Sequence, residues 1–248
     1  MGFLDLSQVS YNYTKDWLGV DRVDWAIPQG QFHCLVGRSG CGKTTLLKLA
    51  AGLLKPDQGR IHLNNQPLTR GSPQIGFVFQ SPNLLEWKNV LDNVLLPVTL
   101  QRKPTESDRA YARRLLQQLG LTDCMGRYPG ELSGGQQSRA AMARALVLSP
   151  ALLLLDEPFA AQDAMTRDEL QDDLLRLCDL GKTTVLFVTH DIHEAVYLAD
   201  QVAVMSHGAI TEKIQIELMR PRSKAVRYSP AFNILCQRVR DALDKAVA

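Results

Sequence analysis

A glycine-rich stretch near the start of the chain has the spacing of a phosphate-binding loop. Residues 37–44 fit GxxxxGK[ST] and lie between a short apolar run, QFHCLVG at 31–37, and a helical pattern. Glycines would let successive N–H groups face a phosphate, Lys43 would add positive charge, and the Thr44 hydroxyl would ligate Mg²⁺. The alternative is a turn that only connects a strand to a helix. We predict a nucleotide site formed by Gly37, Arg38, Ser39, Gly40, Cys41, Gly42, Lys43, Thr44 and Thr45.

Each of three later apolar runs ends in a polar side chain. In ALLLLDEP at 151–158, Asp156 would hold Mg²⁺ and Glu157 would act as the base that activates water. His190 ends TTVLFVTH and would hydrogen-bond a γ-phosphate, while Gln80 ends QIGFVFQ and would reach the metal or the water. A solvated acidic turn and a structural histidine are the alternatives. The expected metal ligands are Thr44, Gln80 and Asp156, and the expected catalytic residues are Glu157, His190 and Gln80.

The elements that must position these residues follow from hydrophobic periodicity. The apolar runs are typical of strands buried on both faces of a mainly parallel sheet. This sheet would be covered by helices, which the sequence predicts at 168–180, at 192–199 and after Ser229-Pro230. The buried face of the last helix would consist of Phe232, Leu235, Val239 and Leu243. LDLSQVSYNY and VDWAIPQG indicate short antiparallel strands, and 81–150 reads as helical. We predict an α/β fold with N-terminal antiparallel strands and an inserted helical subdomain.

Composition limits the classes of protein that remain. The chain has 248 residues, 28 Lys and Arg, and 26 Asp and Glu, so its net charge of +2 does not favour a nucleic-acid partner. The five cysteines show neither CxxC nor a His/Cys ligand spacing, so we expect a reducing compartment without a disulfide framework or zinc site. No secretion signal is visible, and ALLLL at 151–155 is too short to span a bilayer. We therefore expect a cytoplasmic chain.

A second glycine-led helix start, ELSGGQQSRAAMARAL at 131–146, completes a set of motifs in a specific order. The set resembles the ATP-binding subunits of ABC transporters over nearly the whole chain. The resemblance implies ATP and Mg²⁺ as cofactors and an aromatic side chain stacked on adenine, best matched by Tyr13 with Trp17 in reserve. It assigns the Q-loop to Gln80, the signature to 132–136, the D-loop to Asp163 and the H-loop to His190.

The same resemblance implies a dimer. In that family the signature of one subunit closes over the ATP held by the other, which uses a helix N-terminus as an anion site in trans. The residues that would contact the partner's nucleotide are Ser133, Gly134, Gly135, Gln136 and Asp163. Two copies, or one copy and a related subunit, would close over two ATP molecules and reopen after hydrolysis. We expect a feeble ATPase in the monomer.

Departures from the family pattern lie mainly at the dimer contact. The D-loop reads Ala160-Ala161-Gln162-Asp163, where SALD is usual. The signature helix continues as QQSRAAMARAL, and His193 stands where an acidic residue is usual. The nucleotide-binding residues are unaffected.

The resemblance also implies import through a separate membrane permease. We predict one ABC ATPase domain, with a core at 1–80 and 151–220, a helical signature subdomain at 81–150 and a tail at 221–248. Leu84, Leu85 and Trp87 would line a groove for a permease helix, or form the subdomain's own core. The basic tail would lean on anionic lipid or be a solvated helix face; its cations are Arg220, Arg222, Lys224, Arg227, Arg238 and Arg240.

LLEWKNVLDNV and RPRSKAVRYSPAF look like the nitrate, sulfonate, taurine and bicarbonate importers, which work with a periplasmic or extracellular solute-binding protein. The expected location is the cytoplasmic face of the inner membrane, and the cargo is left open. The alternatives are a soluble ATPase that regulates a nucleic-acid or protein assembly, and an inactive structural subunit. Intact Lys43, Glu157 and His190 argue against the latter.

Overall fold

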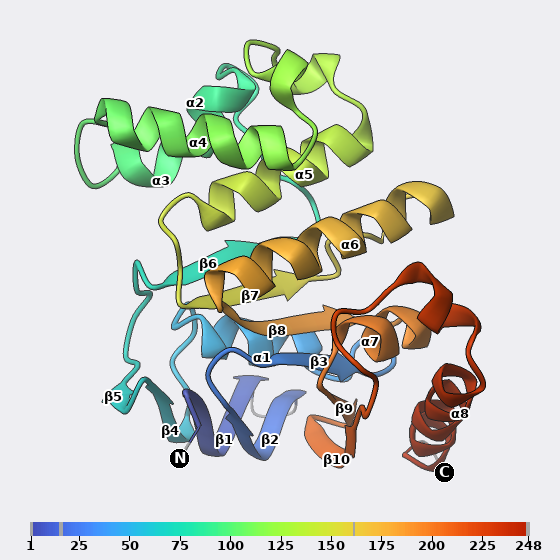
Figure 1. The fold of residues 1–248 in the computed structure, drawn as a ribbon. Helices are drawn as coiled ribbons and strands as arrows, with labels where there is room; N and C mark the ends of the chain where they lie inside the picture. Colours follow the sequence, from blue (N-terminus) through green and yellow to red (C-terminus); the bar gives the residue numbers. More distant parts are fainter. Residues whose placement is uncertain (1, 15–16, 161, 247–248) are drawn as a thin grey trace. The chain divides into compact units, whose positions relative to one another are not determined.

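The computed structural model describes residues 2–14, 17–160 and 162–246. The chain forms two compact units (Figure 1). One contains Met1–Ser72 and Thr184–Ala248, and the other contains Pro73–Thr183. The glycine-rich loop, Tyr13 and His190 belong to the first unit. Gln80, the signature, Asp156, Glu157 and Asp163 belong to the second.

An antiparallel sheet begins the first unit. Its strands lie in the order β2-β1-β4-β5, with bounds β1 Leu4–Thr14, β2 Trp17–Ile27, β4 Gln58–Leu63 and β5 Gln66–Pro67. Leu4 and Leu6 of β1 are buried on either side of the half-buried Asp5, and the alternation is interrupted from Ser7 on, where the strand pairing shifts register. The prediction of antiparallel N-terminal strands is confirmed, although β1 and β2 are longer than expected.

Parallel strands form the centre of the first unit. The order is β10-β9-β3-β8, with bounds β3 Phe32–Val36, β8 Thr184–Thr189, β9 Gln201–Ser206 and β10 Ala209–Gln215. Strand β3 runs parallel to both β8 and β9, and β10 returns antiparallel to β9. Every residue of β3 and β8 is buried, as their unbroken apolar runs require. The helices are α1 Lys43–Ala50, α7 Ile192–Leu198 and α8 Pro230–Lys245.

The second unit combines two parallel strands with helices. Strand β6 Ile75–Val78 pairs with β7 Leu152–Asp156. The helices α4 and α5 lie against each other, with α2 also packed on α5 (Figure 1). Their bounds are α2 Val90–Val94, α3 Leu96–Thr99, α4 Glu106–Gln118, α5 Gly134–Leu146 and α6 Ala164–Gly181. Short 3₁₀ helices occupy Thr122–Cys124 and Pro129–Glu131.

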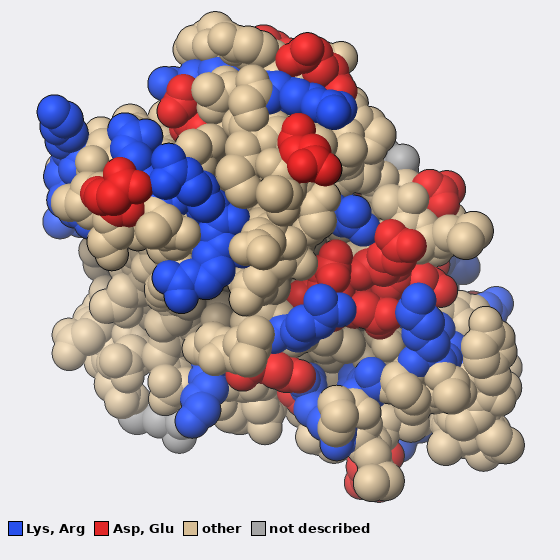
Figure 2. All heavy atoms as spheres, turned by 45° about the horizontal axis from the view of Figure 1, so that its top comes forward, with Lys and Arg blue, Asp and Glu red and all other residues tan. Residues whose placement is uncertain are grey.

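Charged side chains of both signs lie in small clusters on the surface (Figure 2). Near α4 the basic residues are paired with acids, because Arg113 contacts Glu106 and Arg102 contacts Asp108. Within the described ranges, no helix combines the length and the apolar character that crossing a membrane would need.

The α/β fold class predicted above is confirmed. The predicted buried face of α8 needs correction. Phe232 and Val239 are buried as expected, but Leu235 and Leu243 are only half-buried. The buried face is completed by Cys236 and Ala242. The strands β4, β5, β9 and β10 were not predicted. The predicted boundaries of the helical subdomain stay a prediction.

Candidate functional site

The glycine loop between β3 and α1 is shaped by close backbone approaches. A Cβ added at Gly37 would lie 2.6 Å from Cys41 Sγ, and one at Gly42 would collide with the carbonyl oxygen of Gly19. Gly40 and Gly42 have φ angles of 80° and 108°, which L side chains rarely adopt. Gly42 is also the N-cap of α1, with no side chain bonded to the first turn. The first N–H groups of α1 therefore face the loop rather than a capping side chain.

Lys43 lies across this loop. Its side chain is buried, and Nζ donates to the carbonyl oxygens of Gly37 at 2.9 Å and Arg38 at 3.1 Å. The first turn of α1 contains no acidic residue. The helix N-terminus and the ammonium thus concentrate positive potential on the same loop, which suits a phosphate group.

Tyr13 is brought to the first turn of α1. Its hydroxyl lies 3.1 Å from Thr45 Oγ1, and its ring meets that of Tyr11 edge-on at 5.2 Å between centroids. Tyr13 remains 43% exposed, so part of the ring faces solvent beside the loop. This placement favours Tyr13 as the stacking aromatic. The side chain of Trp17, the reserve candidate, lies outside the described residues.

His190 leaves the sheet beside the glycine loop. In the parallel pair of β3 and β8, Val36 is in register with Thr189. Gly37 and His190 therefore follow adjacent strands at the same carboxyl edge, where ligands bind in open α/β sheets. The Asp191 carboxylate accepts from the N–H groups of His193 and Glu194, so the N-cap of α7 directly follows His190.

The same arrangement recurs in the second unit. Val78 of β6 is in register with Leu155 of β7, so Gln80 and the Asp156-Glu157 pair follow adjacent strand ends. Asp156 is buried and Gln80 is exposed. Glu157 has a φ of 45°, which is uncommon for a residue other than glycine. The backbone therefore leaves the extended conformation directly after Asp156, the last residue of β7.

The signature sequence forms the start of α5. Ser133 Oγ accepts from the N–H of Gln136 at 3.2 Å, and Gln136 Oε1 accepts from the N–H of Ser133 at 2.9 Å, which is a capping box. The Ser133 hydroxyl keeps its own proton to donate. A Cβ at Gly134 would meet Gln162 no closer than 3.7 Å, whereas one at Gly135 would lie 2.8 Å from the Thr166 methyl group.

Asp163 has a structural role in addition to the one predicted. It is the N-cap of α6 and accepts from the N–H groups of Thr166 at 3.0 Å and Met165 at 3.1 Å. These bonds, with Thr166 as the main donor, lower the pKa of the Asp163 carboxyl. Its neighbour Gln162 donates to Ser138 Oγ at 3.0 Å and so joins the D-loop to α5. Ala161, part of the predicted D-loop, lies outside the described residues.

Arg144 was not predicted as a site residue. Its guanidinium donates to the carbonyl oxygens of Pro82 at 2.6 Å and Asn83 at 2.7 Å. It thus ties the segment after Gln80 to the signature helix, and burial lowers its pKa. The bonds join residues about sixty positions apart, and a basic residue in an amphipathic helix carries no sign of such a contact.

Of the residues predicted to line a permease groove, one is buried in the protein and one is exposed to solvent. Leu84 is buried in the second unit, whereas Trp87 is 75% exposed. The loop that presents Trp87 is held by the fully buried Asn93, whose amide bonds the backbone of Leu85, Lys88 and Asn89. Trp87 is therefore an exposed aromatic on a well-fixed loop.

The basic tail is partly buried, which corrects both readings of its two central arginines. The side chain of Arg222 is 1% exposed, and Arg227 lies over the ring of Tyr197 at 3.5 Å from its centroid. Arg222 is therefore neither a solvated cation nor a lipid-facing one, while the half-buried Arg227 stacks on an aromatic ring. Arg238 and Arg240 do lie on the exposed face of α8.

Comparison with known proteins identifies the class to which this arrangement belongs. Among solved structures, a dimeric bacterial ABC transporter cassette superposes with a TM-score of 0.78 at 29% identity, covering 87% of this chain and all of the other. A cassette from the ABC transporter complex cbiONQ of Clostridium perfringens gives 0.81 at 27% identity, covering 96% and 97%. The fold and the site define an ATP-binding cassette.

Sequence relatives place the chain more narrowly. The ABC transporter family model matches residues 20–160. The nitrate import ATP-binding protein NrtD of Synechococcus elongatus is 40% identical, covering 93% of this chain and 88% of that protein. An aliphatic sulfonates import ATP-binding protein SsuB of Pseudomonas fluorescens is 46% identical, covering 81% and 72%. This chain belongs to the ABC transporter family.

These matches confirm the prediction of an ATP-hydrolysing subunit that powers import. One superposed cassette is a dimer in a post-hydrolysis state with ADP and Pi, which agrees with the predicted ATP binding and dimerisation. A soluble ATPase that regulates another assembly is not favoured. The roles of individual residues stay predictions.

Proposed function

We propose that this chain hydrolyses ATP at a site shared by two cassettes and thereby drives import of a small anion or related solute. The observation that carries the proposal is the register of the strand pairs. Val36 is in register with Thr189, and Val78 is in register with Leu155. The predicted site residues that follow these strands therefore lie at the carboxyl ends of neighbouring strands.

The first step is phosphate binding at the glycine loop. The N–H groups at the start of α1 and the Lys43 ammonium would hold the β- and γ-phosphates, and Tyr13 would stack on adenine. The Mg²⁺ ligands would be the Thr44 hydroxyl, the Asp156 carboxylate and the Gln80 amide oxygen. This all-oxygen set fits Mg²⁺, which would neutralise charge on the phosphates.

Hydrolysis needs a base and a group that senses the γ-phosphate. The Glu157 carboxylate would take a proton from the attacking water, and the His190 imidazole would hydrogen-bond a γ-phosphate oxygen. The unusual φ of Glu157 supports this assignment, because strained backbone conformations cluster at functional sites.

The second cassette would complete the site from the other side. Ser133, with the N–H groups of Gly134 and Gly135, would meet the γ-phosphate bound by the partner. Gln136 would keep the Ser133 backbone in place, while Asp163 and Gln162 would lie at the dimer contact. Closure would then depend on ATP and reopening on hydrolysis.

Transport would take place through a separate permease at the cytoplasmic face of the inner membrane. Trp87, exposed on its fixed loop, would contact a short permease helix. A solute-binding protein outside the membrane would choose the cargo. Relatives named for nitrate, bicarbonate and aliphatic sulfonates support a small oxyanion or related solute.

Replacing Glu157 by Gln tests this function directly. The amide keeps the shape of the side chain but cannot accept a proton from water, so we expect ATP binding to persist while turnover falls about 100-fold or more. ATP should also stabilise a closed dimer, measured by light scattering. Glu106→Gln, in the exposed first turn of α4 in the same unit, is the matched control. Normal turnover by the Glu157→Gln chain would show that the base lies elsewhere.

A further inference from the structure

The tail that follows β10 is bonded to the end of α7. The Arg222 guanidinium donates to the carbonyl oxygens of Tyr197 and, at 2.6 Å, of Ala199. The last carbonyl groups of a helix lack partners within it, and a cation there is favoured by the helix dipole. Burial lowers the pKa of Arg222 to about 10, which still leaves it charged at neutral pH. Arg222 is therefore a C-terminal cap supplied from 23 or more residues away.

Further contacts from the tail follow the length of α7. The Arg227 guanidinium stacks on Tyr197, and the Phe232 ring lies 6.0 Å from the ring of His193 in the first turn. Just beyond α7, Arg220 pairs with Asp200 at 2.9 Å. Asp200 in turn accepts from the N–H of Phe32 at the start of β3. The tail thus contacts the first and last turns of α7, and Arg220 links it through Asp200 to β3.

The N-terminal end of α7 is joined to the strand that precedes His190. Thr189 Oγ1 donates to Glu194 Oε2 at 2.6 Å and accepts from the N–H of Asp191 at 3.0 Å. His190 lies between Thr189 and Asp191, so its backbone is held by β8 on one side and by α7 on the other. A displacement of α7 would therefore move His190.

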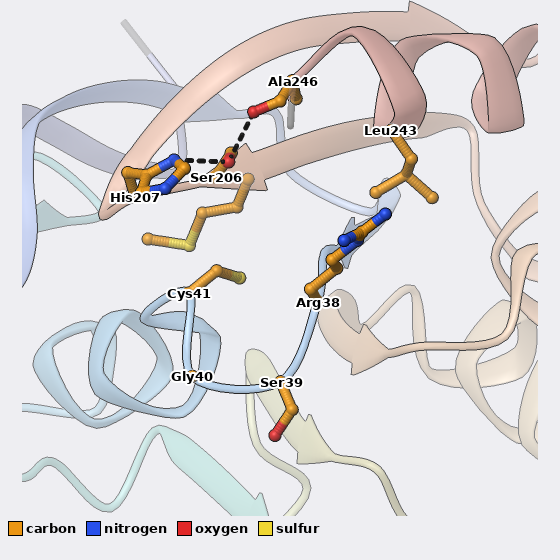
Figure 3. A pocket seen from close by; sticks show the side chains of 9 residues that line it. Arg38, Ser39, Gly40, Cys41, Ser206, His207, Leu243 and Ala246 are labelled. Carbon is orange, nitrogen blue, oxygen red and sulfur yellow. Dashed lines mark hydrogen bonds between the residues drawn. The ribbon is translucent and has the colours of Figure 1, made fainter. Parts of the chain in front are cut away.

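The far end of the tail faces the glycine loop across a cavity (Figure 3). Ser206 Oγ donates to the carbonyl oxygen of Ala246 at 2.8 Å. Leu243 and Ala246 line a cavity of about 330 Å³ together with the loop residues 38–41. The tail therefore contacts α7 and β9 and faces the glycine loop across this cavity.

We propose that Arg222, assisted by Arg227, is a positioning residue that holds His190 in place by capping and bracing α7. The inference rests on the proposed function, in which His190 meets the γ-phosphate. It gives Arg222 a role in the rate of hydrolysis rather than in nucleotide affinity, because its hydrogen bonds go to the end of α7 and not to Lys43 or the glycine loop.

The test compares Arg222→Met with Arg238→Met in the full-length chain. Arg238 is exposed on α8 and serves as the matched control. For Arg222→Met we expect kcat to fall about tenfold, with KM and the Kd for a fluorescent ATP analogue within about twofold. Arg222→Lys should restore part of kcat, because an ammonium can still donate to the carbonyl oxygens. The milder Arg227→Gln should lower kcat less.

A double-mutant cycle with His190→Ala decides the mechanism, using single-turnover hydrolysis at excess protein. If Arg222 acts through His190, Arg222→Met should cost nothing more in the His190→Ala chain. An equal loss in both backgrounds, or a loss matching the unfolded fraction in a thermal melt, would overturn the positioning role while the proposed function stands. A His190→Ala chain with normal turnover would contradict the role of His190 itself and this inference with it.

Discussion

At the scale of single residues, burial changes the pKa of a titratable side chain in a way that the sequence around it does not indicate. His33 is the second residue of β3, with Nε2 2.7 Å from Gln31 Oε1 and its ring 5.8 Å from that of Trp25. Burial is the main reason that the pKa of His33 falls to about 4; Lys213 adds to the fall and Asp200 opposes it. The neutral imidazole is therefore part of the folded structure.

This pKa predicts a loss of stability in mild acid. The unfolded chain takes up a proton at His33 near pH 6.5, and the folded chain only near pH 4. The unfolding free energy contributed by His33 is thus complete above pH 6.5 and should fall by about 3 kcal/mol as the pH drops to 4. Urea unfolding across this range, compared with His33→Gln, measures it. Parallel pH profiles for the two chains would rule out the assigned pKa.

At the scale of elements, one close approach controls how β6 packs on α5. A Cβ at Gly76 would lie 2.6 Å from the carbonyl oxygen of Ala145 and 3.0 Å from side-chain atoms of Leu153 and Pro150. A backbone oxygen cannot move aside as the end of a flexible side chain can. The position therefore accepts only glycine without a shift of the helix.

Gly76→Ala should lower the unfolding free energy by about 1–3 kcal/mol, the usual cost of overpacking a well-packed contact. Gly130→Ala in the same unit is the control, because no atom lies within 4 Å of its added Cβ. The urea unfolding midpoints of the two variants, compared at an unchanged m-value, measure the difference in unfolding free energy. Equal midpoints for the two variants would mean that β6 and α5 are not packed this closely.

The strands that bear the site could be predicted from the sequence, because β3, β7 and β8 are buried on both faces and read as unbroken apolar runs. In the two missed hairpins, β4 and β10 are largely polar and β5 has only two residues, whereas β9 was missed despite its buried apolar centre. Their turns did carry a signal: Asn64-Asn65 and His207-Gly208 all have positive φ, as two-residue hairpin turns of type I′ require.

The residues of the glycine loop and the signature could also be predicted, since each needs a local backbone shape that its own sequence encodes. Arg144 and Arg222 could not, because they bond backbone carbonyls about sixty and more than twenty positions away. The carbonyl group is common to all residues, so no pattern of residue types reveals such a pair.

At the scale of the whole molecule, the predicted site residues are divided between the two units, and the signature is predicted to serve a second copy of the chain. An added Cβ at Gly134 lies 3.7 Å from its nearest neighbour, which is ordinary contact, so the backbone accepts a side chain there. Gly134→Asp would place a negative charge where the partner's γ-phosphate is expected. Lys43→Met removes the buried ammonium with little change in volume. In a homodimer of either variant, both shared sites should lack a working part: the Lys43 ammonium in one variant and the uncharged signature in the other.

Mixing these two variants is the most direct test of a site shared between cassettes. Neither chain alone should hydrolyse ATP, but in a mixed dimer the glycine loop of the Gly134→Asp chain meets the intact signature of the Lys43→Met chain. We expect an equal mixture to regain up to about a quarter of wild-type activity, because half of the dimers are mixed and each has one intact site of two. No recovery on mixing, with dimers confirmed by light scattering, would contradict a shared site.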